Sequence, residues 1–345
     1  MINSELSNLE LLIGEHRAIA PCYEFTIYSD IALDETFLDF YEQSMQALKG
    51  QVTHYIAESM KRPAVIDKKA LQLLPTWIKR PRLGKSYYAE FLGSDRSYGT
   101  TAASILFVLH ARPNPDQISA EQKSAHQKSL QHYYNNDLMY SSPPVNTLRV
   151  TLPLDHELAN GAAFKEWVLG FSALSRGQFA SGHAGLSLNF DNSVVSSDIR
   201  EIMTGRLAAL LLRHPGLDWE NTGSVSNFLL SWKKELSDFI PQIKRVQWLT
   251  FLSEKTLQYL GCQKKLEELL GNDLPITIDP LRHGLSIQAG KEPELGDISR
   301  RDFLPVYRRV AAALRPVRLS KHQGVGRGFS DEAAQEWLEG LDREY

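Results

Sequence analysis

The chain has 345 residues, of which 43% are hydrophobic and 23% are charged. These proportions are typical of a globular protein whose apolar surface offsets the entropy of folding, so a packed core is expected and global disorder is excluded. The 38 Lys and Arg residues against 41 Asp and Glu residues give a net charge of −3, which argues against nucleic acid or an anionic membrane as the main partner.

No targeting segment or cysteine framework is visible. The N-terminal residues contain no basic stretch followed by an apolar one, and the longest strongly apolar run, residues 207–212, is far shorter than the ~18 residues that span a bilayer. Cys22 and Cys262 lie far apart and have no metal-ligand spacing around them. We therefore expect a soluble, cytoplasmic protein with two free thiols and no zinc site.

The first half of the chain predicts strands around one helix. Residues 23–30 alternate aromatic or β-branched residues with polar ones, which predicts a half-buried strand. A helix is expected to begin after Asp34 and to end at Gly50. Residues 87–92 and 104–110 predict two strands joined by a polar turn that contains Asp95, and residues 112–144 predict a polar connector bounded by prolines.

The second half repeats this order. A strand at 148–154, a helix at 162–174 and a strand at 183–190 follow one another, so the order β-α-β occurs twice. This indicates an α+β fold with a mixed or antiparallel sheet layered with helices and, possibly, two β-α-β repeats. We expect one domain over residues 1–345, with 1–144 and 145–345 as possible sub-units.

The remaining residues predict further helices and a strand pair. Helices are expected at 197–213, 255–270 and 303–314, and a strand, turn and strand at 276–289. The loop 290–297 (GKEPELGD) joins the strand pair to the last of these helices. Residues 331–341 are amphipathic and are expected to fold back so that Trp337 is buried.

Local catalytic motifs are incomplete. Residues 83–86 (LGKS) end like a phosphate-binding loop, but Lys79 stands where the first glycine is required. The ten histidines form no HExxH motif, and GLSLN at 185–189 lacks the closing glycine of a nucleophile elbow. We therefore predict no catalytic, cofactor-binding or metal-binding residue and no cofactor, although distant residues can still assemble a site.

Several segments together resemble the bacterial type VI secretion immunity family. They are residues 182–188 (GHAGLSL), 283–290 (HGLSIQAG) with 293–297 (PELGD), 304–307 (LPVY) ahead of 314–318 (LRPVR), and the closing stretch 326–338 with Phe329 and Trp337. The resemblance implies an antidote that binds a toxin of the type VI secretion apparatus, in some cases a nuclease of the virus-type replication-repair class. It implies a binding protein, not an enzyme, and fixes no toxin-binding residue.

Charge complementarity ranks the candidate partner-binding residues. A toxin that acts on DNA needs a basic groove, which acidic groups on a rigidly held loop would fit. Glu292, Glu294 and Asp297 form the densest acidic loop, and Asp95 and Asp191 are second choices. The alternative interpretation is a solvated loop in which glycine and proline only set the turn.

Two other functions stay open. A toxin-loading chaperone or adaptor would bind the same partner without abolishing its activity. An enzyme with a dispersed site would show a deep pocket that joins distant histidines and carboxylates. The sequence leaves the identity of the toxin, the binding surface, the mode of inhibition and the oligomeric state open.

Overall fold

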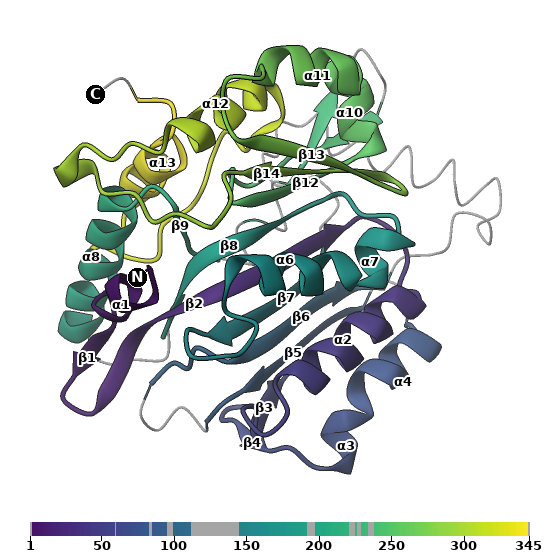
Figure 1. Cartoon of the computed structure of the whole chain (residues 1–345). Coiled ribbons are helices and arrows are strands. Elements are labelled where there is room, and N and C mark those ends of the chain that lie inside the picture. The colour runs from purple at the N-terminus through teal and green to yellow at the C-terminus, as the bar shows by residue number, and fades with distance from the viewer. Residues whose placement is uncertain are drawn as a thin grey trace, which may run out of the picture.

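A single large sheet organises the protein (Figure 1). The computed structural model describes residues 2–58, 60–82, 85–94, 99–111, 145–191, 197–220, 225, 229–233 and 238–343. Within these residues, twelve strands form the sheet in the order β13-β14-β12-β8-β2-β7-β6-β5-β3-β4, with β1 paired to β2 and β9 to β8. The strands are β1 (Leu11–Ile13), β2 (His16–Ser29), β3 (His54–Ala57), β4 (Ala64–Val65), β5 (Ser86–Leu92), β6 (Ser104–His110), β7 (Asn146–Pro153), β8 (Ser181–Phe190), β9 (Leu217–Asp218), β12 (Leu249–Ser253), β13 (Ile276–Leu281) and β14 (Gly284–Ala289).

Strand β2 lies at the centre and sets the topology. It pairs antiparallel with both β7 and β8, so these two strands run parallel to each other on either side of it. The helices α6 (Gly161–Gly170) and α7 (Ser172–Ser175) connect β7 to β8, and α2 (Glu35–Ala47) connects β2 to β3. The α+β prediction is confirmed, and both helical connections join strands that are not neighbours in the sheet.

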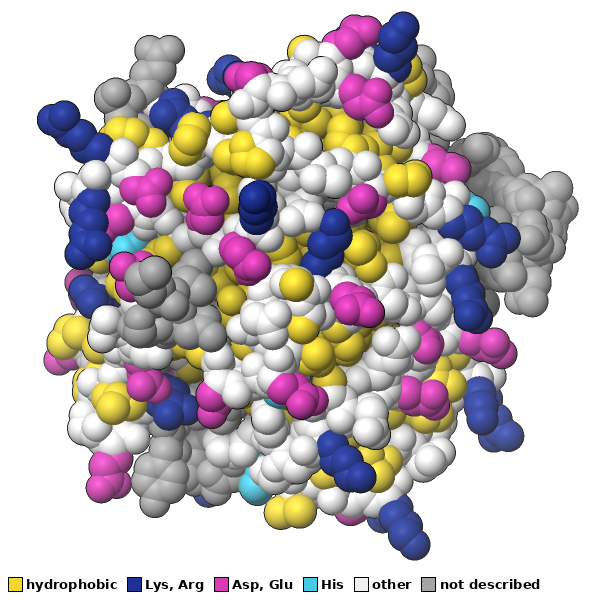
Figure 2. All heavy atoms as spheres, in the orientation of Figure 1, with side chains coloured by type: hydrophobic (Ala, Val, Ile, Leu, Met, Phe, Trp, Pro, Cys, Tyr) yellow, Lys and Arg dark blue, Asp and Glu magenta, His cyan; other side chains and the backbone are white. Residues whose placement is uncertain are grey.

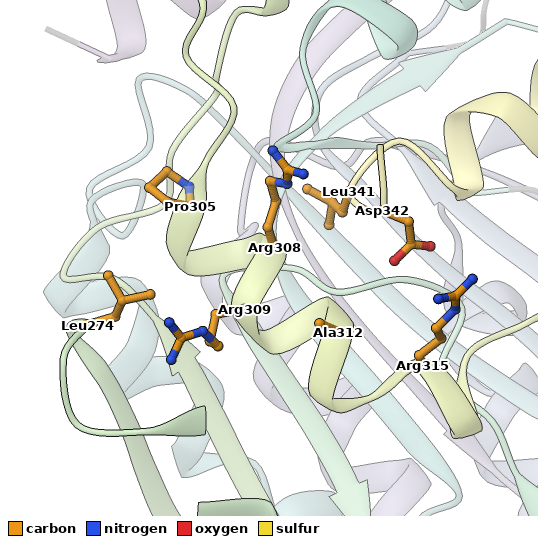
Figure 3. A pocket seen from close by; sticks show the side chains of 8 residues that line it. All are labelled: Leu274, Pro305, Arg308, Arg309, Ala312, Arg315, Leu341 and Asp342. Atoms are coloured by element: carbon orange, nitrogen blue, oxygen red, sulfur yellow. The ribbon is translucent and has the colours of Figure 1, made fainter. Parts of the chain in front are cut away.

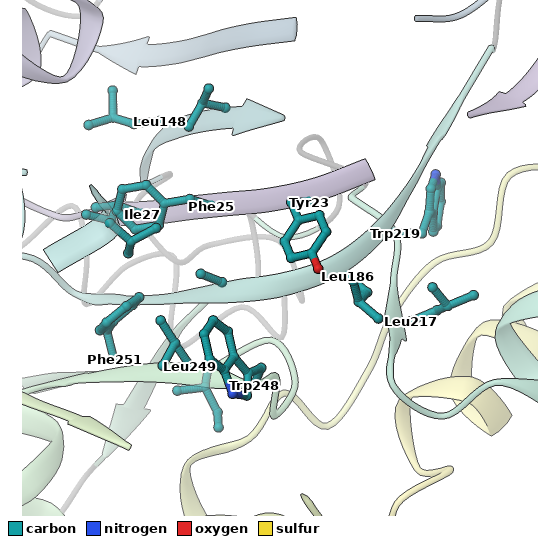
Figure 4. Packing of buried hydrophobic residues seen from close by; sticks show 14 of the residues in the cluster. Tyr23, Phe25, Ile27, Leu148, Leu186, Leu217, Trp219, Trp248, Leu249 and Phe251 are labelled. Carbon is teal, nitrogen blue, oxygen red and sulfur yellow. The ribbon is translucent and has the colours of Figure 1, made fainter. Parts of the chain in front are cut away.

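The two faces of the central strands differ in chemistry because side chains alternate along a strand. Tyr23, Phe25 and Ile27 of β2 are buried in the hydrophobic core (Figure 4). The ring of Phe25 lies 5.5 Å from that of Phe40 in α2 and 5.1 Å from that of Phe171 beside α7. The helical connections therefore cover the apolar face, and the intervening residues of β2 form the polar face.

The remaining elements pack around this sheet. The helices are α1 (Ile2–Ser7), α3 (Lys68–Leu71), α4 (Leu73–Lys79), α8 (Ser197–Arg213), α10 (Glu254–Leu260), α11 (Gln263–Leu270), α12 (Pro305–Ala313) and α13 (Asp331–Leu338), with short 3-10 segments η3 (Ile298–Arg300) and η4 (Arg315–Val317). A separate hairpin consists of β10 (Leu230–Lys233) and β11 (Asp238–Pro241). No helix among the described residues is long and apolar enough to cross a membrane.

Two expectations for the second half can be compared directly with the structure. The single helix predicted at 255–270 is wrong: α10 and α11 are separated at Gly261 and Cys262, whose φ angles are +90° and +86°. Left-handed backbone cannot continue an α-helix, so the chain turns there. The expected return of the C-terminal segment is confirmed, because Trp337 is buried and the Arg245 guanidinium lies 5.1 Å from the centre of its ring.

Candidate functional site

The acidic loop 290–297 joins β14 to η3, and its first carboxylate lies over the start of a helix. Glu292 is exposed, and its carboxylate lies so close to Gly161 that a Cβ on Gly161 would be 1.7 Å from Oε2. Gly161 is the first residue of α6, and a negative charge at a helix N-terminus is favourable. Burial, with the charge of Glu292, raises the pKa of Tyr23 to about 12. Glu292 therefore packs over the first residue of α6.

Asp297 fixes the other end of the loop. Its Oδ1 accepts a hydrogen bond from the backbone N–H of Ser299 at 2.9 Å, which caps η3. Arg213, the last residue of α8, donates to both carboxylate oxygens at 3.0 and 2.6 Å. The hydrogen bonds from Arg213 and Ser299 hold the pKa of Asp297 well below its usual range. Two parallel N–H···O bonds make this the strongest kind of surface ion pair.

Glu294 lies between Glu292 and Asp297 in the loop and lines a surface hollow of about 590 Å³. The hollow is bounded by α1, α8 and residues 294–302. Burial and the nearby charge of Asp302 raise the pKa of Glu294. Glu294 is exposed, and among the described residues no donor is hydrogen-bonded to its carboxylate, so it is open to a partner.

The second-choice acids differ from the loop in their surroundings. Asp191 is only 3% exposed, and its Oδ2 lies 2.9 Å from Nε2 of His16. The structure therefore gives no support to Asp191 as a contact residue. Asp95 lies outside the described residues, as does the predicted connector at 112–144.

A buried network of charged side chains occupies the polar face of the sheet. His183 of β8 places Nε2 3.1 Å from Glu24 of β2 and 3.0 Å from Asp218 of β9. Arg149 of β7 donates to Glu24 at 2.8 Å. Lys244 Nζ lies 2.9 Å from Asp218 and also pairs with a further carboxylate, that of Glu220.

That further carboxylate is Glu220, which accepts from Lys244 Nζ at 2.6 Å and from the Tyr28 hydroxyl at 2.7 Å, both through Oε2. Burial opposes ionisation of Asp218, but Lys244 and His183 outweigh it and lower its pKa to about 2. Burial and Lys244 oppose protonation of His183, but the carboxylates of Asp218 and Glu24 outweigh them and raise its pKa. Three carboxylates thus face the two cations Lys244 and Arg149, and the carboxylates of Asp218 and Glu24 favour the protonated form of His183, so groups of opposite charge offset one another in the buried network.

Glu24, His183 and Asp218 are close enough for their ligand atoms to be considered as a metal site. However, the distances from His183 Nε2 to the two carboxylates are those of hydrogen bonds, and Lys244 Nζ already supplies a positive charge beside Asp218. A metal ion would also need an unprotonated histidine, whereas the carboxylates favour protonation. The residues therefore fit an internal ion network better than a metal centre.

A polar cavity of about 200 Å³ borders this network. Its lining includes Arg149, Glu220 and Asn189, together with half-buried residues of β5 and of the segment before β6. His183 does not line it, so the histidine of the network is shielded from the cavity. This differs from the pocket joining a histidine to carboxylates that a dispersed active site requires.

Outside the hollow beside Glu294, a second surface hollow of about 570 Å³ lies along α12 (Figure 3). Arg308 and Arg309 project from α12, and Arg315 from η4 (Figure 3). Arg309 is bound to both carboxylate oxygens of Asp273 at 2.9 and 3.1 Å. Charges of both signs are interspersed over the visible face of the molecule (Figure 2), in keeping with the small net charge.

Comparison with known proteins adds the family to this α+β architecture. The model of a family described as type VI immunity for VRR-NUC matches residues 111–340, which is more than half of the chain. The chain belongs to this family, and the resemblance found in the sequence is confirmed.

A solved structure is similar over almost the whole length. It is that of the Pseudomonas aeruginosa T6SS protein PA0821, with a TM-score of 0.70 and 19% sequence identity, covering 99% of this chain and 90% of that chain. At this identity the likeness shows a shared fold. No curated protein matches the chain.

Proposed function

We propose that this protein is the cytoplasmic antidote to a type VI toxin with a VRR-NUC nuclease domain, and that it neutralises the toxin by stoichiometric binding. The observation that carries the proposal is the family match over residues 111–340, because the family description names both the immunity role and the toxin class. The engaged state of the buried network supports a binding role over a catalytic one.

The loop 290–297 is the surface that we assign to the toxin. Asp297 is paired with Arg213 of α8, Glu292 packs over the first residue of α6, and the backbone N–H of Glu294 donates to the Tyr307 hydroxyl at 3.1 Å, so the loop backbone around Glu294 is in contact with the scaffold. A contact group that is already ordered loses less entropy on binding. A carboxylate whose own burial is unfavourable also gains from an incoming Lys or Arg of a DNA-binding groove.

The test compares two charge reversals of exposed glutamates. Glu294→Lys is expected to weaken binding of the toxin at least tenfold, whereas Glu42→Lys on the outer face of α2 is expected to leave it unchanged. Binding is measured by calorimetry with a catalytically inactive toxin, and inhibition by the DNA cleavage that the active toxin retains. Equal affinities for the two variants would remove the loop from the interface. Binding without inhibition would indicate a loading adaptor.

A further inference from the structure

The hollow of about 570 Å³ along α12 carries positive charge that the acidic loop does not explain. Three arginines and one aspartate border it together with four apolar side chains, which are Arg308, Arg309, Arg315 and Asp342 with Leu274, Pro305, Ala312 and Leu341 (Figure 3). Residues 300–327 contain eight basic residues and one acidic residue, although the whole chain has a net charge of −3. The hollow therefore lies in a basic segment of an otherwise acidic protein.

The solvent face of α12 forms one wall of this hollow. Pro305, Arg308, Arg309 and Ala312 follow the i, i+3, i+4 and i+7 spacing of one helix face. The opposite face of the helix is buried in the core through Val306, Tyr307, Val310, Ala311 and Ala313. A partner would therefore meet a helix that is already fixed in place, which lowers the entropy lost on binding.

The charged groups of the hollow differ in how far the protein itself engages them. Arg309 is bound by the bidentate ion pair described above. Asp342 is paired with Arg318. Arg315 is exposed, and its side chain makes no hydrogen bond or ion pair with any described residue. The guanidinium of Arg315 is therefore available to a partner.

The chemistry of the hollow fits an acidic protein segment. A guanidinium binds carboxylates and phosphates well, so the partner is negatively charged. A nucleic acid is bound mainly through its phosphates and sugars, which make no use of the apolar surface that Leu274, Pro305 and Ala312 supply. A peptide with apolar side chains between Asp or Glu residues matches both features. A volume of about 570 Å³ takes a few side chains of such a peptide.

The hollow also adjoins the loop that we assign to the toxin. The backbone N–H of Glu294 donates to the hydroxyl of Tyr307 in α12 at 3.1 Å. Asp302 lines the hollow beside Glu294, and Pro305, three residues later, lines the hollow along α12. A partner seated on the loop therefore lies next to the start of α12.

We propose that the hollow along α12 is a second contact surface for the toxin and receives an acidic segment that also carries apolar side chains. This rests on the proposed function, since it takes the toxin as the partner. The acidic loop then meets a basic part of the toxin, and Arg315 meets an acidic part. Contacts of opposite sign in one interface fix the orientation of the partner and disfavour toxins with another charge pattern.

The first test reverses one charge in the hollow. Arg315→Glu is compared with Arg62→Glu, which makes the same change at an exposed position next to β4, at the far end of the sheet from β13 (Figure 1). In calorimetry with inactive toxin, Arg315→Glu is expected to weaken binding at least tenfold and Arg62→Glu to leave it unchanged. Equal affinities of the two variants would overturn this inference alone, whereas no binding by the wild type would overturn the proposed function with it.

The second test identifies what enters the hollow. Ala312→p-benzoylphenylalanine places a photo-crosslinker at an exposed position between the arginines, and the same replacement of Arg62 is the control. We expect a cross-link from position 312 alone, to a toxin segment with Asp or Glu beside apolar residues. A cross-link to a segment without acidic residues would overturn the proposal. Binding of a short DNA duplex that Arg315→Glu abolishes, with toxin affinity unchanged, would assign the hollow to nucleic acid instead.

Discussion

Replacing Lys244 by methionine tests whether the buried ion network supports the fold. The Lys244 side chain is fully buried, and Nζ lies 2.9 Å from Asp218 and 2.6 Å from Glu220. Methionine fills a similar volume but leaves both carboxylates without their cation. Removing one partner of a buried ion pair costs about 3–5 kcal/mol because the remaining charge stays buried.

The matched control is Lys165→Met. Lys165 Nζ lies 2.8 Å from Asp279, but these side chains are 24% and 37% exposed, so water can replace the lost partner. Such a pair contributes about 0–1 kcal/mol. Free energies of unfolding from urea titrations should therefore separate the two lysines by at least about 2 kcal/mol.

A second substitution distinguishes lost charge from lost packing. Lys244→Met combined with Glu220→Gln removes one uncompensated carboxylate, so the pair should be less destabilised than the sum of the two single variants. If Lys244→Met costs less than about 1 kcal/mol, the network is not held by the opposite charges described above and the reasoning fails.

Two further predictions concern pH and the acidic loop. The folded state raises the pKa of His183, so protonation of His183 should stabilise the protein fully below the unfolded value of about 6.5, and this stability should be lost as pH rises through the folded pKa. The variant His183→Gln should therefore flatten the dependence of the unfolding free energy on pH between 5 and 9. An unchanged slope would contradict the raised pKa of His183. A Cβ on Gly216 would lie 1.9 Å from the Glu294 carbonyl oxygen, so Gly216→Ala should displace the loop, cost about 1–3 kcal/mol of stability and weaken toxin binding. A Cβ on Gly170 would meet no atom within 4 Å, so the control Gly170→Ala should be neutral or stabilising by up to ~1 kcal/mol. Equal thermal midpoints of unfolding for the two variants would contradict the close packing of Gly216 against the loop.

Period-two alternation located the central strands because polar and apolar side chains point to opposite faces of the sheet, but the expectation of a half-buried strand is wrong, since both faces of β2 are buried. The strand expected at 23–30 coincides with β2 up to Ser29, and the one expected at 183–190 lies within β8. The same pattern missed β3, which has four residues and lies next to the short terminal strand β4 of the sheet. Short strands near an edge carry little periodicity, so the first helical connection was expected to return at 87–92 instead.

The surroundings of the three loop acids could not be predicted from the sequence for a different reason. The spacing of Glu292, Glu294 and Asp297 predicts a cluster, but their neighbours come from α6 and α8. Only the structure shows that Glu292 packs over Gly161, that Asp297 is paired with Arg213 and that Glu294 faces a hollow. The spacing of the acids ranks the loop, but it does not separate Asp297, which is paired inside the protein, from Glu294, which faces the hollow.

The buried ion network could not be predicted from the sequence either, because its members come from distant segments of the chain. Glu24 and His183 occupy polar positions of alternating strands, and this was the available signal that each faces away from the apolar core. Their meeting depends on the pairing of β2 with β8, and Lys244 joins them from a distant segment. Long-range pairing of this kind is set by tertiary structure, which local patterns do not encode.

Titration of a VRR-NUC toxin with this protein tests whether it neutralises the toxin by binding it. The candidate toxin is incubated with increasing amounts of the full chain, and DNA cleavage is followed together with the mass of the complex. We expect nanomolar association, with cleavage falling to background at one molecule of this protein per toxin. Full cleavage in the presence of excess antidote would contradict it.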